Sequence, residues 1–80
     1  MNRPSLLLRR IDPLRNVARF YELTISPTLF GDVAVTRRWG RIGTSGREIV
    51  ELHARADRAH AAFDRLAAQK SRRGYVAADP

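Results

Sequence analysis

The sequence predicts a small α+β fold in which one C-terminal helix packs across an antiparallel β-sheet. Two observations support this prediction: apolar and polar residues alternate along several segments before residue 54, and apolar residues recur at helical spacing from residue 56 onward. Strands followed by one amphipathic helix are typical of small α+β domains. The 80 residues allow one domain at most, because a chain of this size buries only about 60% of its unfolded surface.

The first strands are predicted on either side of Asp12-Pro13. Residues 6–12 form an edge strand or an extended arm that ends at Asp12-Pro13, and extended backbone is expected there because the residue before a proline avoids the helical region. Residues 18–25 form the clearest strand, and Ser26-Pro27 indicates a turn after it. One face of this strand carries three apolar side chains, those of Tyr21, Leu23 and Ile25.

Two further strands are predicted over residues 33–39 and 47–53. The first alternates, which leaves Trp39 at the edge of the core on the side that carries Val33, Val35 and Arg37. Residues 40–46 supply a turn whose three glycines permit positive φ angles. Residues 47–53 carry apolar side chains on both faces, which favours a central position in the sheet.

A helix is predicted from about Ala56 to near Gly74, a candidate for a left-handed C-terminal cap. We assign residues 16–75 to the domain, residues 1–15 to an N-terminal arm or edge strand, and residues 76–80 to a flexible tail. Whether the arm pairs with the sheet is left open. The helical stripe that would face the sheet consists of Ala56, Ala59, Phe63, Leu66, Ala67 and Lys70.

The charge balance favours a polyanionic partner. The net charge is +7, and arginine supplies 14 of the 15 basic residues. Arginine presents a planar fork of donors that matches phosphate, so this bias suits nucleic acid. The alternative is a coding bias, because GC-rich genomes supply arginine and alanine freely.

Other features of the sequence restrict the function classes. Cysteine is absent, which excludes disulfides and thiolate chemistry among these residues, and no apolar run approaches a membrane span or a signal sequence. We therefore expect a cytoplasmic location, with nucleoid association as an option, and no membrane partner. The oligomeric state is left open.

No motif for catalysis or metal binding fits. The segment GTSG lacks the last glycine of a nucleophile elbow because Arg47 stands there, and neither the P-loop frame nor the dinucleotide-binding frame can be laid over the glycines. His53, Asp57 and His60 have a spacing that could share one helical face, but solvated side chains are the expected reading. We predict a protein that is not an enzyme, with no cofactor and no metal site.

The segment RRWGRIGTSGR, residues 37–47, is the strongest candidate for a binding site. Its glycines let a backbone approach a phosphate closely, and Trp39 offers a flat face on which a base or a sugar could stack. The alternative is that Trp39 plugs the core and the arginines are solvated, and the residues alone do not decide between the two. The basic run at the helix end would extend the surface, although such charges also favour a helix C-terminus. The candidate nucleic-acid-binding residues are Arg37, Arg38, Trp39, Gly40, Arg41, Gly43, Arg47, Lys70, Arg72 and Arg73.

Four segments in order, FYEL, PTLFG, WGRIG and KSRRGY, resemble the WGR domain family over about residues 16–75. The family is named for the tripeptide that stands here as Trp39-Gly40-Arg41, and the chain closely resembles its short stand-alone bacterial members. The resemblance implies an antiparallel sheet with one helix across it. Phe20, Tyr21 and Tyr75 match family aromatic positions that look structural.

The resemblance also implies a function. In poly(ADP-ribose) polymerases, WGR domains help to recognise DNA breaks: the motif tryptophan stacks on the sugar at a strand terminus, and the arginine contacts phosphate or a neighbouring domain. Carried to this chain, Trp39 would stack and Arg41 would make the polar contact, while Gly40 and Gly43 would shape the loop.

The leading hypothesis is therefore a non-enzymatic module that binds DNA ends or nicks with little sequence specificity. The alternative is a protein-interaction or regulatory module that docks an acidic partner through the same loop. DNA versus RNA and the physiological partner are left open.

Overall fold

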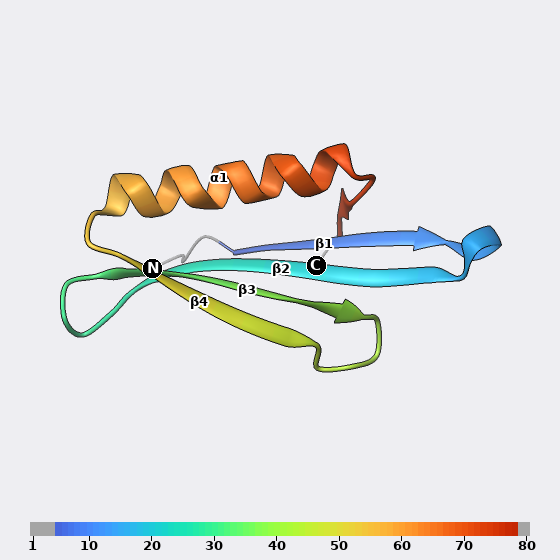
Figure 1. The fold of residues 1–80 in the computed structure, drawn as a ribbon, viewed down its shortest axis with the longest axis horizontal. Coiled ribbons are helices and arrows are strands. Elements are labelled where there is room, and N and C mark those ends of the chain that lie inside the picture. The colour runs from blue at the N-terminus through green and yellow to red at the C-terminus, as the bar shows by residue number, and fades with distance from the viewer. Residues whose placement is uncertain (1–4, 79–80) are drawn as a thin grey trace.

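A computed structural model describes residues 5–78 and confirms the α+β prediction (Figure 1). Five strands form one antiparallel sheet in the order β4-β3-β2-β1-β5, and helix α1 lies along one face of it. A short 3-10 turn, Pro13–Arg15, joins the first two strands. The elements are β1 (Ser5–Asp12), β2 (Val17–Pro27), β3 (Val33–Arg41), β4 (Arg47–His53), α1 (Ala56–Arg72) and β5 (Val76–Ala77).

The core lies between α1 and the helix-bearing face of the sheet. Side chains that are directly paired on neighbouring antiparallel strands point to the same face, so the register decides which residues meet the helix. Tyr21, Leu23 and Ile25 of β2 are all buried on this face, as their alternation predicts. The buried cluster consists of Leu8, Tyr21, Leu23, Ile25, Val35, Ala59, Leu66 and Tyr75.

Strand β4 lies at the edge of the sheet, so the prediction of a central position was wrong. Hairpin connections lead in sequence from β1 to β4, and the chain then crosses back in α1 and adds β5 beside β1, which leaves one side of β4 unpaired. Its apolar side chains Ile49, Val50 and Leu52 are 42%, 51% and 61% exposed. Apolar residues on both faces of this strand therefore reflect exposure and not a central position, which belongs to β2.

Both turns after β2 begin later than predicted. Strand β2 continues through Pro27, and its turn spans residues 28–32. Strand β3 extends to Arg41, so Gly40 stands inside the strand and the turn comprises residues 42–46. Gly40 is required for close approach and not for a turn, since a Cβ there would lie 2.9 Å from Gly46 Cα.

Helix α1 ends as the sequence predicts. Gly74 has φ +91°, and the N–H groups of Gly74 and Tyr75 donate to the carbonyl oxygens of Ser71 and Lys70, both at 3.1 Å. These bonds turn the chain back toward the sheet and bury Tyr75. Ala56 was predicted on the buried stripe but is exposed, and Ala62 is buried in addition to Ala59 and Leu66.

Both ends of the described chain join the sheet. All eight residues of β1 pair with β2, which answers the open question about the N-terminal segment for residues 5–12. Val76 and Ala77, which fell in the predicted tail, pair with Arg9 and Leu8 of β1. The remainder of the predicted arm and tail, residues 1–4 and 79–80, lies outside the described residues.

Candidate nucleic-acid interface

Trp39 lies on the helix-bearing face of β3, close to the C-terminal end of α1. In the sheet it stands directly opposite Tyr21 of β2 and Arg47 of β4. The ring is half-buried: it packs against the hydrophobic core and also lines an open pocket of about 290 Å³. The core thus anchors Trp39 while leaving part of the indole accessible from the pocket. The other lining residues are Tyr21, Arg37, Ile49, Leu66, Gln69, Lys70 and Arg73.

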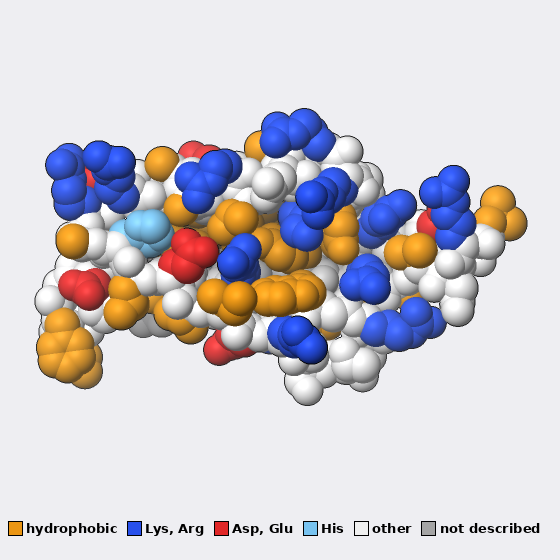
Figure 2. Space-filling model, in the orientation of Figure 1, with side chains coloured by type: hydrophobic (Ala, Val, Ile, Leu, Met, Phe, Trp, Pro, Cys, Tyr) orange, Lys and Arg blue, Asp and Glu red, His pale blue; other side chains and the backbone are white. Residues whose placement is uncertain are grey.

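Positive side chains surround Trp39 because several elements deliver them to the same place. Alternation along β3 puts Arg37 and Arg41 on the Trp39 face, and register with β4 adds Arg47. The Arg37 guanidinium carbon lies 5.8 Å from the centroid of the Trp39 ring. The end of α1 contributes Lys70 and Arg73 to the pocket wall. Figure 2 shows basic side chains around an apolar strip in the middle of the molecule and onward toward the β1–β2 hairpin.

Lys70 lies among the positive charges that surround the pocket, and they affect its pKa. Its ammonium nitrogen lies 4.6 Å from the ring centroid of Tyr21 and 5.4 Å from that of Tyr75. Burial lowers the pKa of Lys70, and the charges of Arg73, Arg37 and Arg19 lower it further. An anion bound beside Lys70 would relieve this repulsion.

The floor of the pocket holds polar atoms that have no partner within the described chain. Arg37 Nε and the Tyr21 hydroxyl are both buried, and neither makes a hydrogen bond there. Burial raises the pKa of Tyr21, although the neighbouring Arg37 opposes this rise. The phenol therefore keeps its proton at neutral pH, and its hydroxyl can donate a hydrogen bond. One arm of Arg37 reaches Glu51 at 3.6 Å. A buried donor without a partner is costly, so this floor favours a ligand that accepts hydrogen bonds.

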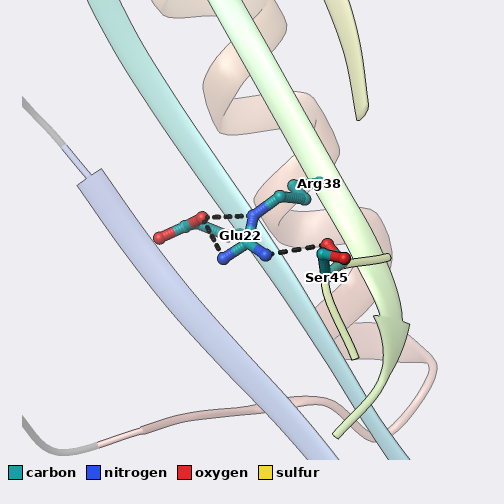
Figure 3. Close-up of polar contacts among 3 residues, drawn as sticks. All are labelled: Glu22, Arg38 and Ser45. Carbon is teal, nitrogen blue, oxygen red and sulfur yellow. Dashed lines mark hydrogen bonds and ion pairs between the residues drawn. The ribbon is translucent and has the colours of Figure 1, made fainter. Parts of the chain in front are cut away.

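Arg38 points to the opposite face of the sheet and is occupied there (Figure 3). Its Nε donates to Glu22 Oε1 at 3.0 Å, its Nη1 donates to the Ser45 carbonyl oxygen at 2.8 Å, and its guanidinium lies 4.9 Å from the Phe20 ring centroid. These contacts hold the 42–46 turn against β2. The structure therefore separates Arg38 from Trp39 although the two are adjacent in the sequence.

The other predicted residues take different positions. Gly40 packs against Gly46 within the hairpin, and Gly43, with φ +98°, lines a smaller pocket of about 190 Å³ with Phe20 and Arg38. Arg72 is exposed and follows Lys70 by two positions, so its side chain is turned away by roughly 200° around α1. None of these residues lines the Trp39 pocket.

Sequence reasoning missed two arginines near this site. Arg10 of β1 pairs with Arg19 of β2, and Arg19 pairs with Arg41 of β3, so three arginines stand side by side on the Trp39 face. The sequence indicates the position of Arg19, because alternation along β2 places it on the same face as Tyr21, Leu23 and Ile25. The position of Arg10 depends on the register between β1 and β2, which could not be predicted from the sequence.

Two negative findings concern other sites. Within residues 5–78, no three His, Cys, Asp or Glu side chains lie close enough together to hold a metal ion, and His53 stands on β4 apart from Asp57 and His60 on α1. No helix in the same span has the length and apolar character needed to cross a membrane.

Comparison with known proteins identifies a family and a relative. The WGR domain family matches residues 5–80, a range that includes β1. The uncharacterized protein y4dW of Sinorhizobium fredii (strain NBRC 101917 / NGR234) is 46% identical over 70 residues, which cover 88% of this chain and 34% of that protein. The chain thus spans about a third of the length of the curated relative that it matches.

Proposed function

The chain belongs to the WGR domain family of nucleic-acid-binding modules, and on this premise we propose that it binds DNA at ends or nicks without reading the base sequence. One observation carries the proposal: a tryptophan anchored by the core is accessible from a pocket walled by arginine and lysine. The family is one of binding modules and not of catalysts, and we propose no reaction. A DNA partner implies a location in the cytoplasm, at the nucleoid.

In the proposed complex, Trp39 stacks on the sugar or base at a strand terminus. Stacking on an aromatic side chain contributes about 1–3 kcal/mol per base. A base inside an intact duplex is covered by its neighbours on both sides, whereas a terminus exposes a flat surface. Because Trp39 is half-buried, its exposed part can stack on a terminus but cannot insert between paired bases, which supports a preference for ends and nicks.

Phosphates would be held by the cations that share the Trp39 face. These cations make charge-assisted hydrogen bonds to phosphate oxygens, which fix position and carry no sequence information. We leave Arg38 out of this set because Glu22 neutralises it on the other face, and Arg72 because it points away from the pocket. The proposed phosphate contacts are Arg37, Arg41, Arg47, Lys70 and Arg73.

The test compares Trp39→Ala with Phe30→Ala. Phe30 is 89% exposed in the 28–32 turn, apart from the pocket, so its variant controls for the loss of an aromatic ring. We expect Trp39→Ala to weaken binding to a nicked duplex by roughly 5- to 150-fold, the equivalent of about 1–3 kcal/mol of stacking. We expect Phe30→Ala to leave the affinity unchanged. Fluorescence anisotropy of a labelled duplex measures both.

A competition experiment tests the preference for ends. Linearised DNA should compete better than the same DNA as a covalently closed circle. Equal competition by the two forms, or equal affinity of Trp39→Ala and the unmodified protein, would overturn the proposal. It would then favour a module that docks an acidic protein through the same surface.

A further inference from the structure

The arginine row, Arg10, Arg19 and Arg41, is an arrangement that the fold itself does not require. The three residues are direct neighbours on β1, β2 and β3 and point to the helix-bearing face. Like charges directly opposite each other in a sheet are destabilising. A fold that keeps three of them in line therefore gives up some stability at this place.

No carboxylate within the described chain compensates this charge. The ion pairs that arginine makes among residues 5–78 join Arg15 to Asp12, Arg37 to Glu51, Arg38 to Glu22 and Arg55 to Asp57, and none includes a member of the row. The guanidinium of Arg41 makes only long hydrogen bonds, 3.4 Å to Asn16 Oδ1 and 3.5 Å to the Asn16 carbonyl oxygen.

The row is also open to a large ligand. Helix α1 ends near it, since the Arg10 Nε atom lies 3.6 Å from the point that a Cβ on Gly74 would occupy. The β1–β2 hairpin extends beyond this end of the helix (Figure 1). Arg19 and Arg41 are exposed, and Arg10 is half-buried.

The spacing of the row suits a phosphodiester backbone. Neighbouring strands lie about 4.8 Å apart, so the row spans about 10 Å. It stands about 7 Å from Trp39, because Arg41 follows Trp39 by two positions along β3. A strand of duplex DNA carries one charge per about 3.4 Å of helix axis, so the row matches about three consecutive phosphates. Arginine forks bind such oxygens bidentately.

We propose that the arginine row is a second contact, which holds the internal sugar-phosphate backbone next to the terminus bound at Trp39. The inference rests on the proposed function and assigns different roles in DNA binding to Trp39 and to the arginine row. Trp39 supplies the preference for ends, whereas Arg10, Arg19 and Arg41 supply affinity that does not depend on an end.

The double variant Arg10→Gln/Arg19→Gln tests this division. Its matched control is Arg58→Gln/Arg65→Gln, which removes the same charge from two exposed arginines of α1 that have no carboxylate partner within residues 5–78. We expect the row variant to weaken binding to closed-circular and linear DNA by the same factor. The slope of log K against log salt should decrease by about 2, because each lost phosphate contact removes about 0.9. The control should change the slope far less.

A second measurement separates binding from folding. Without DNA, the row variant should be at least as thermally stable as the unmodified protein, because the substitution removes repulsion. A structural role for the row would instead lower the melting temperature.

Three further results would overturn the inference. Equal slopes for the row variant and the control would mean that only net charge matters. A row variant that loses affinity for ends alone would place the row inside the Trp39 site. Competition by polyglutamate as strong as that by DNA of equal charge would point to an acidic polypeptide. The proposed function fails separately, through the Trp39→Ala and closed-circle results.

Discussion

At the scale of the residue, the functional reading depends on which face each side chain takes. Trp39 and Arg38 are adjacent in the sequence, yet alternation sends Trp39 to the helix-bearing face and Arg38 to the other. The same segment therefore provides both the ligand platform that we propose and an arginine that fastens the hairpin to Glu22 and the Ser45 carbonyl. If residues 37–47 are interpreted as one basic motif, these two roles are not distinguished.

Lys70 gives a prediction about pH at this scale. Burial and the neighbouring Arg73, Arg37 and Arg19 lower the pKa of its ammonium group, and a bound phosphate would raise that pKa again by favouring the charged form. At a pH where Lys70 of the free protein is partly deprotonated, binding of DNA is therefore accompanied by the uptake of a proton. The affinity for DNA should fall as the pH rises through the pKa of Lys70 in the free protein.

The variant Lys70→Arg is the comparison, because its guanidinium stays charged. Its affinity should change little between pH 7 and about pH 9.5 at constant ionic strength, while the unmodified protein loses affinity. Anisotropy titrations of a nicked duplex measure both profiles. Identical profiles would show that Lys70 does not lie beside a bound phosphate.

At the scale of the element, the order of the strands determines which apolar residues contribute to stability. Ile25 of the central strand β2 is 3% exposed, whereas Ile49 of the edge strand β4 is 42% exposed. The two residues belong to the same type and the same kind of element. They differ chiefly in how much protein surrounds them.

The matched variants Ile25→Val and Ile49→Val test this difference. Both remove one methylene group and retain a β-branched side chain, so their strand propensities change alike. Ile25→Val should lower the free energy of unfolding by about 0.5–1.5 kcal/mol, and Ile49→Val should cost less than about 0.5 kcal/mol. Urea denaturation measures both values. Equal losses would argue that another molecule covers β4 or that the strand order is different.

At the scale of the whole molecule, the dominant property is unbalanced positive charge. The net charge is +7 and the radius of gyration is 13.5 Å. The Debye length is about 30 Å at 0.01 M salt and about 8 Å at 0.15 M. At low salt the excess positive charges therefore repel one another over most of the molecule, and at physiological salt most distant pairs are screened.

Salt should consequently stabilise the free protein and weaken its complex with DNA. Without DNA, the melting temperature should rise between 0.01 M and 0.15 M sodium chloride, because screening reduces the self-repulsion. With excess duplex DNA, the increase in melting temperature on binding should shrink over the same range, since counterion release is less favourable. Circular dichroism melts follow both trends. A free protein destabilised by salt would show that attractive ion pairs outweigh the repulsion.

The sequence by itself determined the features that depend on local backbone geometry. The period-two pattern located β2 and β3 and put Tyr21, Leu23 and Ile25 on the core face, and the helical period located α1. Gly74 indicated where the helix stops. Four ordered segments indicated the WGR family, which the family match confirms. The strand, helix and cap predictions succeed because each depends on residues that are near one another in the chain.

The tertiary structure decided everything that depends on which strands meet and in which register. It made β4 an edge, left Trp39 half-buried, brought Lys70 and Arg73 to its pocket and aligned Arg10 and Arg19 with Arg41. Alternation is a property of one strand, whereas register is set by the apolar side chains that several strands and a helix bury together. The surface around Trp39 is therefore encoded in the whole set of packing contacts, and the motif that names the family supplies only part of it.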